Sequence, residues 1–198
     1  MSATATRMPA ADRRRHLVET AIRLFTTRSY RGTTTAEIAR TAGVSEPILY
    51  RHFASKRDLY LAVLEHVWAK TRETWQRKLD EAADACDAVE AIGKGHVSVR
   101  SPKLQLAELW VQALGEASDD PELRRHLRGH MREVHEFVAS LIRRGQEQGA
   151  IAQERDPDSE AWIMLSGGIL GMVGRRIGVL DDKELAAIRA ARLAWLRG

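Results

Sequence analysis

A short segment near the start of the chain constrains its fold most strongly, because it predicts two brief helices and the turn between them. Thr34 followed three residues later by Glu37 is typical of a capping box, in which each side chain satisfies a free backbone N–H of the first turn. Gly43 favours the end of that helix, and Ser45 with Pro47 favours the start of the next. The pattern predicts a helix, a turn of about three residues and a second helix.

Helical periodicity continues along the chain, and no alternating β-branched run of convincing length interrupts it. We therefore expect an all-α protein of about nine helices, separated by Gly, Pro and Asp breakers. Besides the two brief helices, the expected ranges are 11–28, 56–79, 87–100, 103–118, 121–148, 157–178 and 182–197. The predicted domains are a three-helix head with a helix-turn-helix, residues 1–56, and a larger helical body for ligand binding and dimerisation, residues 57–198.

Charge is unevenly distributed along the chain. Residues 1–60 contain 11 Lys and Arg against 5 Asp and Glu, whereas residues 61–198 contain 20 against 22. A basic head on a near-neutral body indicates an anionic partner that the head engages. A solvated basic face is the alternative, and charge alone does not decide between the two.

Composition and processing signals narrow the class of protein. Hydrophobic residues make up 44% of the chain and charged residues 29%, which argues against disorder. The single cysteine, Cys86, excludes an internal disulfide framework and has no recognisable catalytic partner nearby in the sequence. We expect a cytoplasmic protein, because residues 1–11 lack the apolar stretch of a secretory signal and the apolar region 161–173 is too short to span a bilayer.

The two brief helices belong to a longer string of residues that carries more information than a helix-turn-helix alone. The string reads GTTTAEIA at 32–39 and AGVSEPILYRHF at 42–53, followed by Ser55, Lys56 and Leu59. Its expected inward side consists of Ile38, Ala39, Val44, Leu49 and Phe53. The string closely resembles the DNA-binding domain of the TetR (tetracycline-repressor) family of bacterial transcriptional regulators over roughly residues 13–60, and the rest of the chain resembles that family in architecture only.

The resemblance implies a role for each matching position of the head. Positions that would contact DNA phosphates are Thr34, Thr35, Tyr50 and Lys56. Positions that would face base edges in the major groove are Glu46, Pro47, Ile48, Arg51 and His52. Ser45, at the start of the recognition helix, completes the predicted DNA-binding set.

Two positions depart from the family pattern. Ser29 stands where the family often has glycine, which would cost about 1 kcal/mol if that position needs a positive φ. Ile48 replaces a frequent threonine, which favours contact with a thymine methyl over a hydrogen bond. Glu46 is compatible with two interpretations, an acceptor for a cytosine amino group or a solvated charge at a helix start.

The end of the chain favours dimerisation. Residues 161–174 are apolar on most faces, and the last helix also presents apolar side chains, so the two together would form a four-helix interface with a second copy, as the resemblance also implies. The residues expected at this interface are Gly167, Gly171, Gly174, Leu185, Ile188 and Trp195. The alternative is a buried hairpin within a monomer.

The body is expected to enclose a small-molecule effector site, again by resemblance. The candidate residues are Trp75, His96, Trp110 and Phe137, each of which could instead be ordinary core. His126 and His130 lie one helical turn apart, as two metal ligands can, but a solvated or core-edge pair is the favoured interpretation. We expect no metal and no cofactor.

These features predict a ligand-responsive regulator, more specifically a repressor that binds a palindromic operator in double-stranded DNA as a homodimer and is released by an unidentified effector. An enzyme is disfavoured, because the chain contains no Gly-x-Ser-x-Gly, no His-Glu-x-x-His and no P-loop signature. Two alternatives stay open, a DNA-binding protein of the same fold without an effector, and an architectural protein without sequence preference.

Overall fold

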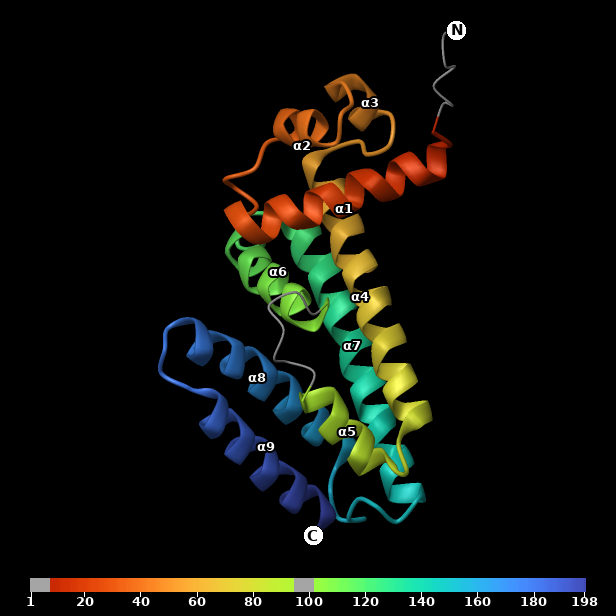
Figure 1. The fold of residues 1–198 in the computed structure, drawn as a ribbon, viewed down its shortest axis with the longest axis vertical. Coiled ribbons are helices and arrows are strands. Elements are labelled where there is room, and N and C mark those ends of the chain that lie inside the picture. The colour runs from red at the N-terminus through yellow and green to blue at the C-terminus, as the bar shows by residue number, and fades with distance from the viewer. Residues whose placement is uncertain (1–7, 95–101) are drawn as a thin grey trace, which may run out of the picture.

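The computed structural model describes residues 8–94 and 102–198, and for residues 93–94 and 102–107 it describes the backbone only. Within these ranges the chain forms nine helices and no strand (Figure 1). The helices are α1 Ala10–Arg28, α2 Thr35–Thr41, α3 Glu46–Tyr50, α4 Lys56–Glu81, α5 Ala85–Lys94, α6 Pro102–Ala117, α7 Pro121–Glu147, α8 Pro157–Arg176 and α9 Asp182–Arg197. The expected all-α class is confirmed, although the predicted extension of α5 to residue 100 reaches beyond the described residues.

Side-chain caps explain why several helices begin where they do. Thr34 accepts a hydrogen bond from the Glu37 N–H, Asp120 from two N–H groups of α7, and Asp156 from the Ser159 N–H. Each of these bonds satisfies a backbone donor that has no partner within the helix. Ser45 occupies the corresponding position before α3, but its side chain makes no capping bond, so α3 depends more on its packing against the head.

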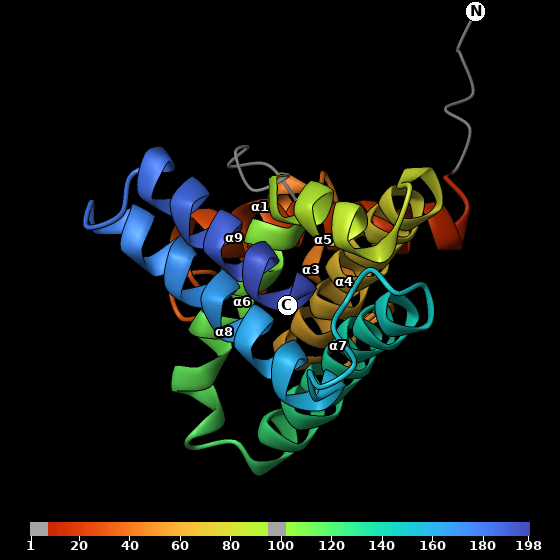
Figure 2. The ribbon, with the colours of Figure 1, turned by 90° about the horizontal axis from the view of Figure 1, so that it is seen from below.

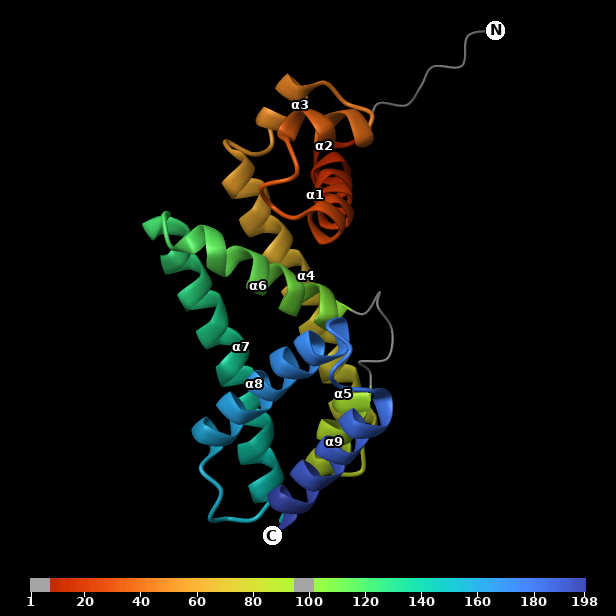
Figure 3. The same cartoon turned by 90° about the vertical axis from the view of Figure 1, so that its left-hand side faces the viewer.

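The head consists of α1, α2 and α3, grouped at one end of the molecule (Figure 3). Its core is formed by buried side chains from all three helices and from Phe53, three residues after α3, and the chief helical members are Leu17, Phe25, Ile38 and Leu49. Val44 is half-buried, whereas Tyr50 is 47% exposed. The short helix α3 buries only Leu49 fully, which leaves much of the Tyr50 side chain in solvent.

The body is organised around α4 and α7, two long helices that run alongside one another away from the head (Figure 1). An apolar stripe of α7 faces this core, with Leu127, Val134, Val138 and Leu141 buried and Met131 partly buried. Seen from the end opposite the head, α8 and α9 form one flank of the body and α4 and α7 the other (Figure 2). None of the described helices is long and apolar enough to cross a membrane.

Ser29 ends α1 in a backbone conformation that side chains rarely adopt. Its φ of 70° and ψ of 168° lie in a region populated almost only by glycine, and it is the one non-glycine residue of the described chain with a positive φ. Two bonds support this conformation, from the Ser29 N–H to the Phe25 carbonyl and from the Gly32 N–H to the Ser29 hydroxyl. The sequence comparison of Ser29 with the family's glycine therefore identified a strained position.

Candidate nucleic-acid interface and its connection to the body

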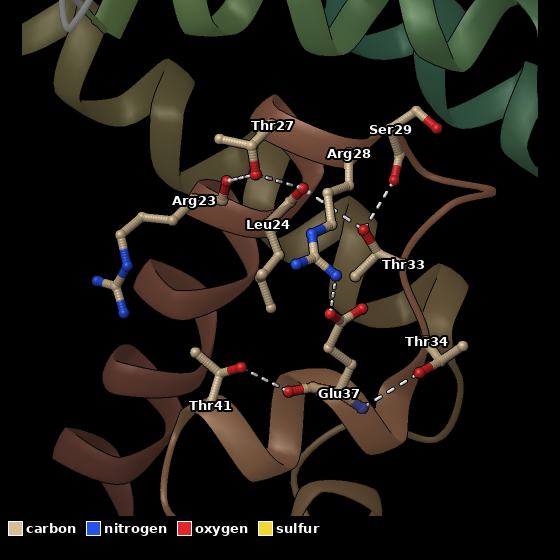
Figure 4. A network of polar contacts seen from close by, with 9 residues as sticks. All are labelled: Arg23, Leu24, Thr27, Arg28, Ser29, Thr33, Thr34, Glu37 and Thr41. Atoms are coloured by element: carbon tan, nitrogen blue, oxygen red, sulfur yellow. Dashed lines mark hydrogen bonds and ion pairs between the residues drawn. The ribbon is translucent and has the colours of Figure 1, made fainter.

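A network of polar contacts joins the end of α1 to the start of α2 (Figure 4). The Thr34 side chain caps α2 as predicted, through a bond of 3.2 Å from the Glu37 N–H. The Glu37 carboxylate, however, forms an ion pair with Arg28 of α1, where a complete capping box would turn it back to Thr34. The Thr33 hydroxyl donates to the Ser29 carbonyl at 2.9 Å. These contacts orient α2 relative to α1, so that α3 in turn has a firm support.

A second network joins α2 to α3. The Thr35 hydroxyl donates to Oε1 of Glu46 at 2.6 Å and lies 3.1 Å from the Tyr50 hydroxyl. Thr35 is buried, so this bond forms in a region where loss of a partner is costly. One carboxylate oxygen of Glu46 is therefore occupied within the head. The Thr35 hydroxyl faces α3 in this structure. The phosphate contact that the family resemblance implies for Thr35 stays a prediction.

The other residues of the predicted DNA-binding set surround the solvent side of α3. The exposed members are Thr34, Ser45, Pro47, Tyr50 and Arg51, and the half-buried members are Glu46, Ile48, His52 and Lys56. The backbone turn that separates α2 from α3 contains Gly43 with a φ of 68°, a left-handed conformation that suits glycine. Apart from Thr35, every predicted residue in the segment 34–56 thus contributes to the solvent-accessible surface of this region.

Two cation–ring contacts lie next to this surface. The Lys56 ammonium lies 4.2 Å from the centre of the Tyr30 ring, and partial burial lowers the pKa of Lys56. The Arg14 guanidinium lies 4.7 Å from the centre of the Phe53 ring at the end of α3. Sequence reasoning missed Arg14, and the only signal that could have identified it was the run of three arginines at 13–15.

Ion pairs connect the head to the turn between α6 and α7. Arg57, at the start of α4, contacts Asp120 at 3.1 Å and Glu122 at 2.5 Å. Arg31 of the head contacts Glu116 of α6 at 2.7 Å. The N–H of Leu123 and then the Arg57 guanidinium lower the pKa of Asp120. The cationic side chains on the head side and the acidic side chains on the body side therefore form an electrostatic contact between the two.

An aromatic group reinforces the same junction from inside. The rings of Phe25, Tyr30 and Tyr60 pack edge to face or tilted, with centres 4.8 to 5.8 Å apart. The fully buried Tyr60 hydroxyl donates to the Leu109 carbonyl of α6 at 2.6 Å. Burial, followed by the neighbouring Tyr30, raises the pKa of Tyr60, so the hydroxyl keeps its proton. A displacement of α6 would thus act on α4 through the Tyr60 hydroxyl and on α1 through the contact between the Tyr60 and Phe25 rings.

The predicted effector residues fall into two places in the body. Trp75 and Phe137 lie together, 5.9 Å between ring centres, and both contact Trp68. Trp110 lies apart from them and donates from its indole N–H to Nδ1 of His130 at 3.1 Å. Residue 96 lies outside the described residues. The structure therefore brings Trp75 and Phe137 into one aromatic cluster, with Trp110 joined to it through His130, whose ring also contacts Trp68.

The histidines of α7 have different surroundings. Burial lowers the pKa of His130 to about 4, so its ring is neutral at physiological pH. His126 lies 3.6 Å from Glu65, away from the Trp110 contact of His130. The described residues with metal-ligand spacing are instead His135, Glu136 and Asp158. The Arg143 guanidinium contacts both of those carboxylates, which suits an ion-pair cluster.

The last two helices present an apolar surface and also contact each other. A Cβ on Gly171 would lie 3.2 Å from Leu185, and one on Gly174 would collide with Leu180, so these two glycines allow α9 and the preceding turn to approach α8. Gly167 has no such neighbour. Of the eleven exposed large apolar side chains in the described chain, seven belong to this hairpin. They are Trp162, Ile163, Leu170, Ile177, Val179, Ile188 and Trp195.

Comparison with known protein families agrees with this architecture. Residues 17–63 match the family described as bacterial regulatory proteins, tetR family, and residues 87–194 match the C-terminal family of BetI-type transcriptional repressors, which spans more than half of the chain. The chain belongs to the TetR family of transcriptional regulators. It is accordingly a DNA-binding regulator of transcription, and the helix-turn-helix of this TetR-family protein is its DNA-binding element.

Individual relatives share either the head or a larger part of this TetR-family chain. It is 49% identical over 59 residues to the transcriptional activator FasR of Mycolicibacterium smegmatis, covering 30% of this chain and 27% of that protein. It is 32% identical over 117 residues to the regulator BetI of Rhizobium meliloti, covering 58% of this chain and 57% of that protein. The chain thus spans about a quarter and somewhat more than half of these two relatives.

Solved structures share the whole fold at low sequence identity. A TetR-family regulator from Agrobacterium tumefaciens superposes with a TM-score of 0.76 at 18% identity, covering 96% of this chain and all of that one. A regulator from Saccharomonospora viridis, solved in complex with choline, superposes with a TM-score of 0.75 at 22% identity, covering 93% and 95% of the two chains. These likenesses establish a common fold.

Proposed function

We propose that this TetR-family protein is a repressor that binds a palindromic operator as a homodimer and is released from it by a small-molecule effector. The single observation that carries the proposal is the pairing of a braced, solvent-facing α3 with a large apolar surface at the opposite end of the chain. One recognition helix contacts few base pairs, so a symmetric pair of heads is needed for tight and specific binding. The apolar surface of α8 and α9 is suited to form that pair.

The roles of individual residues in this proposal follow from their exposure. Arg51 and His52 face base edges together with Pro47 and Ile48, whereas Thr34, Tyr50 and Lys56 hold phosphates. Arg14, which lies on the Phe53 ring, adds a further phosphate contact next to α3. Glu46 contributes its second carboxylate oxygen, since Thr35 occupies the first.

Release by an effector is supported by the contacts between head and body. Asp120 of the α6–α7 turn binds Arg57, Glu116 of α6 binds Arg31, and the Tyr60 hydroxyl donates to the Leu109 carbonyl of α6. An effector that prefers a different position of α6 and α7 would move α4 with them and change the separation of the two heads. Both the domain boundary near residue 56 and the effector role of Trp75, Trp110 and Phe137 belong to this proposal.

Selection of bound duplexes from a random DNA library at near-physiological salt tests DNA recognition. Enrichment of one two-fold symmetric sequence is the expected result. Salt-sensitive binding without an enriched sequence would favour an architectural protein instead, because phosphate contacts alone carry no sequence preference.

Dimerisation is tested with a charge placed on the apolar surface. Ile188→Glu, on α9, should convert the dimer to monomer in sedimentation and weaken operator binding. Leu114→Glu is the matched control, because Leu114 is equally exposed but belongs to α6. If both variants stay dimeric, the interface lies elsewhere.

Effector release is tested first with choline, because a structural neighbour holds it and because the faces of Trp68, Trp75 and Phe137 attract quaternary ammonium groups. Choline, followed by a panel of small aromatic and apolar compounds, is titrated into the protein–operator complex. The expected compound lowers operator affinity in the native protein and less in Arg57→Gln, which lacks the contact with the α6–α7 turn. A compound that binds the body without changing operator affinity in any concentration range contradicts the proposed release.

A further inference from the structure

A cavity of about 220 Å³ lies between α5, α8 and α9. Figure 3 shows α8 and α9 diverging from their connecting turn, with α5 beside α9. The cavity walls come from all three helices, and the residues of α8 on its surface include Gly167, Gly168 and Gly171. Glycine has no side chain to fill the space beside the helix, and a Cβ built on Gly167 or Gly168 would meet no atom within 4 Å. The absence of side chains at these positions keeps the cavity open.

Most of the cavity surface is apolar. Besides the glycines, its wall is made by aliphatic and thioether side chains, namely Val89, Ile92, Ile163, Met164, Met172, Leu185, Ile188 and Leu193. One water molecule occupies about 30 Å³ in the liquid, so a volume of this size holds roughly seven water-sized groups. A methylene group has a similar volume, so the cavity holds an aliphatic tail of about seven carbons, as in octanoate, with the polar head beyond it. A wall of this kind strongly favours an apolar occupant.

The polar part of the wall is mainly cationic. Three arginines, Arg175, Arg189 and Arg192, line the cavity together with one carboxylate, Glu90. Glu90 has an interaction partner of its own. Arg175 pairs with Asp182 outside the wall. The wall therefore presents more guanidinium groups than carboxylates to whatever enters it.

Only one of these arginines, Arg189, retains unused hydrogen-bond donors that a ligand can reach. Arg192 pairs with the buried Glu160, and its Nε is enclosed by protein atoms. Arg189 makes no ion pair and no hydrogen bond with any residue that the structure describes, although it is only half-exposed. A guanidinium offers five N–H donors in a planar fork that matches a carboxylate or phosphate. Unsatisfied donors next to an apolar wall therefore select a ligand with an anionic head and an aliphatic tail.

We propose that this cavity is a binding site for a small amphipathic anion, with its tail between α5, α8 and α9 and its carboxylate-type head on Arg189. The site is separate from the aromatic cluster of Trp68, Trp75 and Phe137, and it has the opposite charge preference to a site for a quaternary ammonium. Ile163 and Ile188 belong both to its wall and to the exposed apolar surface of the hairpin. Gly167, Gly171 and Leu185 of the wall are also expected at the dimer interface, so an occupant would bind at that interface.

Calorimetric titration of the full-length protein with three probes of equal chain length tests the proposal. The probes are octanoate, 1-octanol and octyltrimethylammonium, which carry a negative, a neutral and a positive head on the same tail. Octanoate should bind at least about fivefold more tightly than octanol, since hydrogen bonds to charged groups are stronger than neutral ones. The cationic probe should bind more weakly than either.

Variants separate the contribution of the head from that of the cavity. Arg189→Gln should reduce octanoate affinity to the level of octanol, while Lys183→Gln, which removes the same charge from an exposed position of α9, should change neither. Gly168→Leu should abolish binding of both probes by occupying the cavity, and helical circular dichroism checks that this variant is folded. Equal affinities for the three probes, an Arg189→Gln variant that binds octanoate like the native protein, or no binding of any probe would each overturn the proposal. Because no DNA is present, this result is independent of operator recognition and of effector release.

Discussion

Ser29→Gly is expected to stabilise the protein, because Ser29 occupies a backbone conformation that suits glycine. Relief of such a conformation is worth about 2 kcal/mol, within a range of about 1 to 3. Glycine increases the freedom of the unfolded chain, which costs about 0.7 kcal/mol. Loss of the exposed bond of 3.3 Å from the Gly32 N–H to the Ser29 hydroxyl costs about 0.5 kcal/mol. The net gain is therefore about 1 kcal/mol.

Thermal and urea unfolding of matched variants measures this gain. For a chain of this length, about 1 kcal/mol corresponds to an increase in Tm of roughly 2 to 4 °C. Ser29→Ala is the control, because it removes the hydroxyl but keeps the Cβ that makes the conformation unfavourable. It should lower the free energy of unfolding by about 0.5 kcal/mol. A Ser29→Gly variant no more stable than Ser29→Ala would refute the assignment of strain to Ser29.

Three further predictions concern the junction, the DNA surface and the buried histidine. Tyr60→Phe removes the buried bond to the Leu109 carbonyl and should lower the free energy of unfolding in urea by about 1 to 2 kcal/mol, whereas Tyr30→Phe, whose hydroxyl makes no hydrogen bond with any described residue, should lower it by less than about 0.5. Arg51→Ala should weaken operator binding by about tenfold or more in a fluorescence titration, with little change in stability, and equal affinity would remove Arg51 from the interface. Burial lowers the pKa of His130 to about 4, below its unfolded value, so the unfolded state binds the proton first and stability should decline as the pH falls from about 6.5 towards 4, by up to about 3 kcal/mol. His130→Gln should flatten that decline in urea unfolding measured across this range, and an unchanged slope would assign it to other groups.

Local signals in the sequence were sufficient to predict most of the fold. A helix start depends on a few neighbouring residues, so Asp120 with Pro121 and Asp156 with Pro157 marked the beginnings of α7 and α8, and both aspartates do cap these helices. The recognition surface was likewise predicted as a contiguous string of residues. Its solvent exposure follows from the inward positions of Ile38, Leu49 and Phe53.

Contacts between residues far apart in the sequence could not be predicted in this way. Glu37 was expected to complete a capping box, yet its carboxylate pairs with Arg28. Helix α1 places the Arg28 guanidinium beside this carboxylate, and a full positive charge attracts it more strongly than the backbone N–H of Thr34 does. The bond between Thr35 and Glu46 depends on the crossing of α2 and α3. The cavity lined by Arg189 exists only because α8 and α9 diverge, which no local pattern encodes.

The bond between Thr35 and Glu46 limits how this protein can be redirected to a new operator. A substitution at Glu46 would remove one of the two partners of the buried Thr35 hydroxyl and leave only the Tyr50 hydroxyl, so it would weaken the support of α3 as well as the contact with any base that Glu46 meets. The side chains of Pro47, Ile48 and Arg51 make no hydrogen bond or ion pair with any residue that the structure describes. Libraries that vary these three positions while keeping the Thr35–Glu46 pair should yield folded variants with altered specificity, whereas changes at Glu46 should succeed only together with compensating changes at Thr35.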